Sequence, residues 1–295
     1  MQYRRRSSSR LKPSVGTPKA RARSDDYMRQ FTSNAQAAVR HFHGDAFAIG
    51  PNALSKVEGD VFELLEAAAL WNGMAVWNRY MDTGVWTSPH LAIPAGAVPT
   101  PRRKVAVLKL PRGYDPTRLF RDDVRATIRA HEASLRLRHM ELGLSSPDIV
   151  GVRIPHPTPP AFEPFMTPLE SMDGPTVTRL EHARELVEGT LEASSFLLAI
   201  AVKRSTRSDR LYQPLFEANV LKYLVVHVLQ GAALRFHVHM ESLEGADVVG
   251  AYQAASLISL LRGGEPALAV DKVVQILRPI DAVQAVLDDL PLFPL

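Results

Sequence analysis

The sequence predicts an α/β fold in which helices flank a central mixed β-sheet. Segments typical of strands alternate along the chain with segments that carry apolar residues at helical spacing. The most apolar segment, residues 196–202, is short and opens onto polar residues, as a buried central strand does. The 295 residues show no internal repeat and no clear domain boundary, which favours one large domain.

The first half of the chain contains two predicted helices with one strand between them. Residues 60–81 have apolar side chains at helical spacing, and residues 104–110 alternate loosely, as in a strand. Residues 122–142 form the second predicted helix, and its apolar stripe includes His131. A lone histidine on such a stripe is more often a hydrogen-bonded core residue than a metal ligand, so we predict a structural role.

The second half continues the alternation. The predicted elements are, in order, a strand over 148–154, a helix over 178–193, the apolar strand over 196–202, a helix over 214–233 and a strand over 235–240. A polar turn over residues 204–213 follows the apolar strand, and we expect Pro214 in the first turn of the next helix, where proline is tolerated. Two or three acidic helices complete the chain.

The net charge of +4 comes from one end of the sequence. Residues 1–24 hold eight Lys and Arg and no acidic residue, whereas residues 25–295 hold 27 Lys and Arg against 31 Asp and Glu. We therefore predict a basic disordered arm, residues 1–24, followed by a single folded domain, residues 25–295. The arm lacks the apolar run of a secretory signal. We consider three interpretations of it: a segment that attracts phosphates, a silent solvated tail and a transit peptide.

The composition excludes several kinds of site. The chain has no cysteine, which excludes disulfide scaffolds, thiolate zinc sites and thiol nucleophiles. Its longest apolar run, residues 196–202, is far too short for a membrane span. We find no Gly-rich phosphate loop, nucleophile elbow or paired-histidine zinc helix. His237 and His239 face the same side of a predicted strand, and without further ligands we interpret them as part of a solvated strand face.

Three charged residues stand where the predicted elements would bring them together. Asp148 begins a strand, Lys203 ends the buried strand, and Glu217 lies on the apolar face of the helix that follows. A buried carboxylate is costly unless it meets a cation. Two acids and a lysine at strand ends are what metal-assisted phosphodiester hydrolysis requires, because carboxylates bind Mg²⁺ and a lysine can orient or deprotonate a water.

These positions resemble the PD-(D/E)XK nuclease superfamily, in the variant found among CCGG-cutting Type II restriction endonucleases. Most of the superfamily has an acid two residues before the lysine, but that residue is Ala201 here. The variant moves the carboxylate to the next helix, where Glu217 lies. The variant's usual serine at the position of Ala201 is also absent, and that position is not expected to bind metal.

The segment from Lys203 to Arg210, KRSTRSDR, matches the K-x-x-x-R-x-D-R element of these enzymes. The resemblance implies that Arg207, Asp209 and Arg210 recognise the CCGG core. The chemistry agrees, because arginine can donate two hydrogen bonds to guanine and aspartate can accept one from cytosine N4, each good bidentate contact adding roughly 1–3 kcal/mol of discrimination. The alternative is a solvated charged loop with internal Arg–Asp pairs.

The resemblance extends from about Phe47 to the end of the chain. Residues 59–63, with Trp71 and Asn72 beyond them, look like the family's N-terminal helix, whose glutamate contributes to the metal site. Glu63 matches that glutamate. Glu66 is the alternative, and a surface salt bridge is the other interpretation of Glu63.

The resemblance implies a restriction-endonuclease-like fold, an Mg²⁺ cofactor held by Asp148, Glu217 and Glu63, and double-stranded DNA as the partner. It implies double-strand cuts at an R-CCGG-Y palindrome before the first C of the core, with four-base 5′ extensions and 5′-phosphate ends. Because a palindrome requires two-fold symmetry, we expect at least a homodimer, with a homotetramer as the alternative. We expect a protein of the prokaryotic cytoplasm with no membrane partner.

Two other functions fit parts of the pattern. A repair or structure-specific PD-(D/E)XK nuclease would share the acids and the lysine but would have no use for the Arg-x-Asp-Arg segment. A non-catalytic DNA-binding regulator would need neither the buried carboxylate nor the lysine at the strand end.

Overall fold

The computed structural model describes residues 23–44, 49–144, 146–204, 208–244, 247–253 and 267–293. Its sheet has five strands in the order β1-β2-β3-β4-β5. They are β1 (Val105–Lys109), β2 (Ile149–Arg153), β3 (Phe196–Lys203), β4 (Arg235–Met240) and β5 (Lys272–Gln275). The pairs β1–β2 and β2–β3 are antiparallel, and β3–β4 and β4–β5 are parallel. The predicted α/β fold with a mixed sheet is confirmed.

Strand β3 is the central strand, as its apolar sequence predicted. It is buried from Phe196 to Val202, and only its last residue, Lys203, is partly exposed. Ala201 faces one apolar cluster and Val202 the other, because successive side chains of a strand point to opposite faces.

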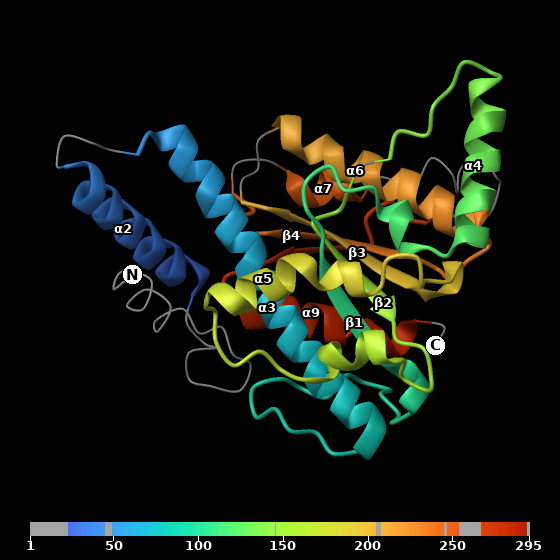
Figure 1. The fold of residues 1–295 in the computed structure, drawn as a ribbon, viewed down its shortest axis with the longest axis horizontal. Helices are drawn as coiled ribbons and strands as arrows, with labels where there is room; N and C mark the ends of the chain where they lie inside the picture. The colour runs from blue at the N-terminus through green and yellow to red at the C-terminus, as the bar shows by residue number, and fades with distance from the viewer. Residues whose placement is uncertain are drawn as a thin grey trace.

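Helices cover both faces of the sheet (Figure 1). The helices packed on one face are α2 (Ser24–His43), α3 (Pro51–Thr83) and α9 (Pro279–Leu287). The helices packed on the other face are α4 (Asp122–Arg136), α6 (Ser208–Lys222) and α7 (Val248–Tyr252), while α5 (Gly174–His182) contacts α3 and β1. In Figure 1, α4 projects beyond the rest of this layer.

Helix α3 is the longest element and begins nine residues before the predicted Asp60. Its middle is buried on all sides, because it lies between the sheet, α9 and the segment that precedes α5. At Gly73 the contact with α9 is so close that a Cβ atom would collide with the side chain of Val283, so a larger residue would disturb the packing there. The helix ends at Thr83, and the next residue, Gly84, caps it with a left-handed φ of 71°.

Several predicted helix boundaries are wrong. Helix α4 ends at Arg136 rather than near residue 142, since Leu137 is 86% exposed and has no core to pack against. The helix predicted over 178–193 is α5, which ends at His182 and gives way to a 3₁₀ turn and then Gly189, whose φ of 73° interrupts a right-handed helix.

Helix α6 begins at Ser208, so the predicted polar turn is already helical six residues before Pro214. Pro214 lies inside the helix and removes one backbone hydrogen bond there, but does not end it. Beyond Lys222 the chain continues as a π-helix to Val228. Near the C-terminus the predicted acidic helices correspond to α7 and α9, and strand β5 between them was missed because it is a short edge strand.

Helix α2 was not predicted, and it begins at Ser24, inside the predicted arm. Ser24 is buried, and its backbone N–H donates a hydrogen bond of 2.7 Å to the carbonyl of Leu277. Residues 1–22 of the arm lie outside the described residues. Among the helices that the structure describes, none is long and apolar enough to cross a membrane.

Candidate active site

A polar cleft of about 1160 Å³ opens where α3, the start of β2 and the end of β3 meet. Three of the predicted catalytic residues line it, each from a different element: Glu63 from α3, Asp148 from just before β2, and Lys203 from the end of β3. The basic residues Lys56, Arg112 and Arg204 line it as well. The cleft therefore combines acidic and basic side chains.

Asp148 and Lys203 form an ion pair at the edge of the sheet. Lys203 Nζ donates to Asp148 Oδ2 over 3.1 Å, and the backbone N–H of Val202 donates to the same oxygen over 2.7 Å. The antiparallel pairing of β2 with β3 explains the contact, because the start of one strand lies opposite the end of the other. The side chains of Asp148 and Lys203 are only 16% and 13% exposed, so the surrounding protein restricts their movement.

Glu63 is the second acid of the cleft. Burial raises its pKa to about 7, and the nearby negative charge of Asp148 adds to the rise, while Lys109 and Arg112 oppose it. Glu63 Oε2 lies 3.5 Å from Lys109 Nζ and Oε1 lies 4.0 Å from Arg112 Nη2. Two carboxylates that repel one another in a partly buried cleft are a favourable environment for a cation.

Glu66, the alternative to Glu63, has a different environment. It is buried on α3, and its Oε1 is hydrogen-bonded to His239 Nδ1 at 2.5 Å. His237 on the same strand is hydrogen-bonded to Asp289 at 2.7 Å. Both histidines are fully buried, so our interpretation of a solvated strand face is wrong: helix α3 and the C-terminal segment cover this face of β4.

Glu217 lies on α6 and is buried, as the apolar stripe predicted. It does not line the cleft, but Gln213, which does, donates a hydrogen bond of 2.7 Å to Glu217 Oε1. Among the described side chains, no three of His, Asp and Glu lie close enough together to hold a metal ion. The structure thus brings Glu63, Asp148 and Lys203 into one cleft and places Glu217 next to a residue of its lining.

Two of the residues predicted to recognise bases fall on α6. Asp209 and Arg210 lie in its first turn, although their side chains are outside the described part of the structure. Arg207 precedes the helix and is outside the described residues. The predicted K-x-x-x-R-x-D-R element therefore joins the end of β3 to the start of a helix rather than forming a turn throughout.

A family model described as Cfr10I/Bse634I restriction endonuclease matches residues 19–290. The chain belongs to this family. It is therefore a Type II restriction endonuclease, a DNA-binding hydrolase of a restriction–modification system. Enzymes of this family generally use a divalent metal, which agrees with the carboxylates of the cleft.

Solved structures show the same fold. The crystal structure of the Type IIF restriction endonuclease Bse634I with cognate DNA matches with a TM-score of 0.76 and 18% identity, covering 98% of this chain and 90% of that one. A second structure of Bse634I matches with a TM-score of 0.73 and 18% identity, covering 92% of this chain and 87% of that one. A search of curated proteins finds no match.

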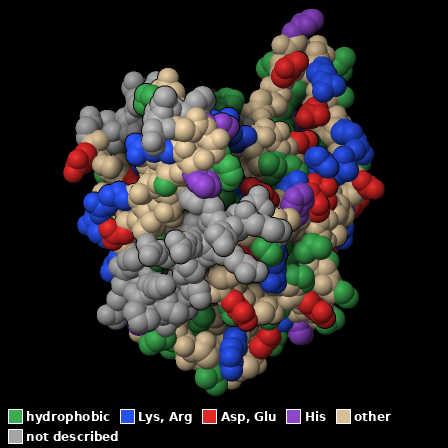
Figure 2. All heavy atoms as spheres, turned by 60° about the vertical axis from the view of Figure 1, so that its left-hand side comes forward, with side chains coloured by type: hydrophobic (Ala, Val, Ile, Leu, Met, Phe, Trp, Pro, Cys, Tyr) green, Lys and Arg blue, Asp and Glu red, His purple; other side chains and the backbone are tan. Residues whose placement is uncertain are grey.

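The charge of this endonuclease is distributed in small groups. Residues 102–138 hold eleven Lys and Arg against four Asp and Glu, and they include α4. Figure 2 shows basic and acidic side chains interspersed over the face that it presents, including the projection at the top.

His131 on α4 is half-buried and hydrogen-bonded to Tyr223 at 3.0 Å, which agrees with its predicted structural role.

Sequence reasoning missed several residues of the site. Lys109, which pairs with Glu63, ends strand β1 as Lys203 ends β3, so a lysine at the end of a buried strand was an available signal. Gln213 had no such signal, because nothing in the sequence indicates that it hydrogen-bonds Glu217. Arg204 pairs with Glu58 and Glu241, which are 146 and 37 residues away in the chain and could not have been assigned from spacing.

Proposed function

We propose that this endonuclease makes Mg²⁺-dependent double-strand cuts at a palindrome with a CCGG core, of the R-CCGG-Y kind. Cleavage before the first C of the core would leave four-base 5′ extensions and 5′-phosphate ends. One observation carries the proposal: the Asp148–Lys203 pair shares a cleft with Glu63, directly before the segment that contains Arg207, Asp209 and Arg210.

The carboxylates of the cleft fit a divalent cation. Glu63 and Asp148 present oxygen donors, and burial together with the charge of Asp148 raises the pKa of Glu63, so a bound cation would favour its ionised form. Together with Glu217 they form the proposed ligand set. When bound, Mg²⁺ would polarise the scissile phosphate and lower the pKa of a coordinated water.

Lys203 acts on the attacking water and the phosphate in this proposal. Its ammonium is held toward the cleft by Asp148, and Asp148 is itself fixed by the N–H of Val202. A cation in this position orients the water and stabilises negative charge that develops on the phosphate. Both contacts come from the β2–β3 ladder, so the lysine is positioned before DNA binds.

Recognition of the core is assigned to Arg207, Asp209 and Arg210. Arginine can bind guanine O6 and N7 in the major groove, and aspartate can accept a hydrogen bond from cytosine N4. Because a palindrome presents each half-site once to each protomer, we propose a homodimer as the minimal unit and a homotetramer as the alternative.

Digestion of plasmid and phage DNA with Mg²⁺ tests the proposal, with Lys203→Ala as the inactive control. We expect discrete fragments whose sequenced ends carry the four-base extension of a CCGG core. Discrete fragments with other ends would contradict the recognition sequence but leave the nuclease assignment standing. A smear, or cuts that depend on DNA structure, would favour a nuclease without sequence recognition.

A further inference from the structure

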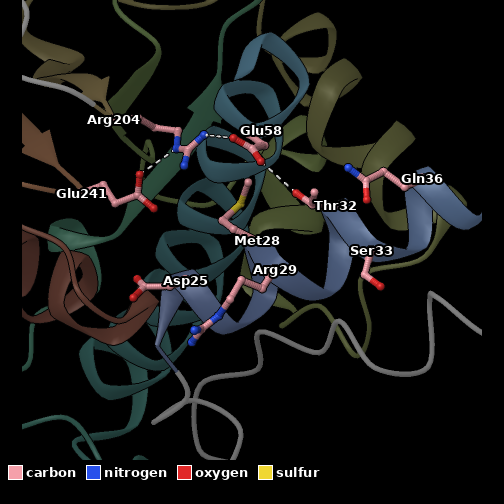
Figure 3. A pocket seen from close by; sticks show the side chains of 9 residues that line it. All are labelled: Asp25, Met28, Arg29, Thr32, Ser33, Gln36, Glu58, Arg204 and Glu241. Carbon is pink, nitrogen blue, oxygen red and sulfur yellow. Dashed lines mark hydrogen bonds and ion pairs between the residues drawn. The ribbon is translucent and has the colours of Figure 1, made fainter. Parts of the chain in front are cut away.

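Arg204 follows Lys203 directly and lies between two carboxylates from distant parts of the chain (Figure 3). Its Nη1 donates to Glu58 Oε2 over 2.6 Å, and its Nε donates to Glu241 Oε2 over 2.7 Å. The arginine side chain is 25% exposed, and the two carboxylates are 21% and 17% exposed. Hydrogen-bonded ion pairs that are this far removed from water hold a defined geometry.

Glu241 holds the end of β3 twice. Its side chain accepts from Arg204, and its backbone N–H donates to the carbonyl of Lys203 over 3.1 Å. This hydrogen bond continues the pairing of β3 with β4 as far as Glu241, the residue after β4. Lys203 and Arg204 therefore both contact Glu241. The main chain under the lysine is restrained by these two contacts.

Glu58 connects the same arginine to α3. It lies on that helix five residues before Glu63, so whatever fixes Glu58 relative to Arg204 also fixes the helix that carries the second acid of the cleft. Thr32 of α2 donates a hydrogen bond of 2.8 Å to the other oxygen of Glu58, as Figure 3 shows. Hydrogen bonds from Arg204 and Thr32 lower the pKa of Glu58 although burial opposes the shift.

The Arg204–Glu58 pair also forms a wall of the active site. Both residues line the large cleft, and both line a smaller cavity of about 330 Å³ whose other residues come mostly from α2. The pair therefore stands between α2 and the catalytic cleft. The positive charge of Arg204 is already paired within the protein, because two carboxylates accept hydrogen bonds from its guanidinium.

We propose that Arg204 is a positioning residue of this endonuclease: by bridging Glu58 and Glu241 it sets Lys203 at a defined place relative to the helix that carries Glu63. The inference rests on the proposed function, in which Lys203 acts on the water and phosphate. Arg204 transmits its effect through neighbouring residues and does not itself contact the DNA.

Cleavage of plasmid DNA by the full-length protein with Mg²⁺ tests this, alongside DNA affinity in EDTA and thermal unfolding. We expect Arg204→Ala and Glu58→Ala each to lower the cleavage rate at saturating enzyme by roughly 10- to 100-fold, as small displacements of catalytic groups do. DNA affinity should change by less than about threefold. The double variant should be no slower than Arg204→Ala, because Arg204→Ala already removes the link to Glu58.

Two further variants separate positioning from folding. Arg204→Lys can keep one of the two ion pairs and should recover part of the lost rate, and Glu58→Gln should lose less than Glu58→Ala because it still accepts from Thr32. Arg278→Ala removes an arginine from an exposed pair with Asp281, 2.6 Å apart, and is the matched control expected to cut at the wild-type rate.

The opposite result is well defined. If Arg204 contacts a DNA phosphate, Arg204→Ala weakens DNA binding and its salt dependence, whereas Glu58→Ala releases the arginine and leaves cleavage unchanged or faster. That pattern overturns the inference. A second pattern also overturns it: Arg204→Lys and Glu58→Gln cut at the wild-type rate, and the alanine variants are unfolded.

Lys203→Ala distinguishes this inference from the function on which it rests. If Lys203→Ala is inactive while Arg204→Ala and Glu58→Ala cut at the wild-type rate, only the positioning role fails. If Lys203→Ala cuts as fast as the wild type, the proposed active site fails, and with it the inference.

Discussion

Two charged clusters lie against the same helix, and they differ in how far the protein encloses them. Glu63 faces the cleft, where burial, followed by the charge of Asp148, raises its pKa. Glu66, one turn further along α3, is buried against His239 in a hydrogen-bonded pair. The difference between the two acids is one of surroundings: Glu63 shares an open cleft with a second carboxylate, whereas Glu66 is enclosed against one histidine.

The buried contacts of the two histidines, Glu66 with His239 and His237 with Asp289, form a histidine network that extends to the C-terminal segment. Asp289 accepts from His237, and its carboxylate also lies within 3.2 Å of Lys272 and 3.4 Å of Arg235. Burial opposes ionisation of Asp289, but its contacts with His237 and Lys272 outweigh this and lower its pKa to about 2. These contacts join β4, β5 and the C-terminal turn, so we assign them a role in stability.

The largest contrast is expected from the two lysines. Lys203→Ala should reduce DNA cleavage by roughly 10²- to 10³-fold, the range for loss of one group that stabilises charge in the transition state. Lys272→Ala should leave cleavage nearly unchanged and lower the free energy of unfolding, because Asp289 loses a partner. Cleavage rates and urea unfolding of both variants measure this. Equal losses of cleavage would contradict the separation of the two clusters.

The neighbouring glutamates should show the same contrast on one helix. Glu63→Gln should abolish most cleavage while keeping or raising stability, because it removes a carboxylate whose ionisation is unfavourable. Glu66→Gln should cost about 1–3 kcal/mol of unfolding free energy by disrupting the buried contact with His239, with cleavage largely retained. Denaturant unfolding and metal titration of both variants decide which acid belongs to the metal site. A loss of cleavage confined to Glu66→Gln would reverse our assignment.

The two clusters should also respond to pH in opposite directions. The pKa of Glu63 is raised to about 7, so the folded state retains a proton that the unfolded chain loses, and the unfolding free energy falls as pH rises from about 4.5 to 7. Burial lowers the pKa of His237 to about 4, and the nearby charge of His239 adds to this while Asp289 opposes it. The unfolding free energy therefore rises as pH rises from about 4 to 6.5.

Unfolding in EDTA across pH 4 to 7 separates these slopes. In Glu63→Gln the unfolding free energy should rise more steeply with pH than in the wild type, and in His237→Gln it should fall as pH rises. Each substitution should change the unfolding free energy by on the order of 1–3 kcal/mol over this pH range. Wild-type slopes in both variants would show that neither group titrates as the structure indicates.

The smallest effect is expected from the basic arm. Because Ser24 is anchored to Leu277, truncation should remove residues 1–22 and leave α2 intact. We expect weaker nonspecific DNA binding with a shallower salt dependence, and the same cleavage site. Binding titrations at several salt concentrations and sequencing of the product ends test this. A changed recognition sequence would mean that the arm takes part in recognition.

The amino-acid pattern alone was enough to predict the central strand of the sheet and the meeting of Asp148 with Lys203. Residues 196–202 are too apolar to lie anywhere but the interior, so Lys203 had to emerge at a strand end, and Asp148 at the head of β2 had to meet an adjacent strand. The burial of Glu217 followed from its helical stripe. These inferences held because they depend on local periodicity and on strand ends, which short segments encode.

Other features of the site depend on contacts between distant elements. Glu63 and Glu66 fit the same helical pattern, and the packing of α3 on β4 determines which one meets a histidine. His237 and His239 alternate as on a half-exposed strand, and a distant segment buries them. The Arg204–Glu58 pair joins residues 146 positions apart. Such contacts are set by how elements pack together, because charge and periodicity along the chain do not specify which distant partner a side chain will meet.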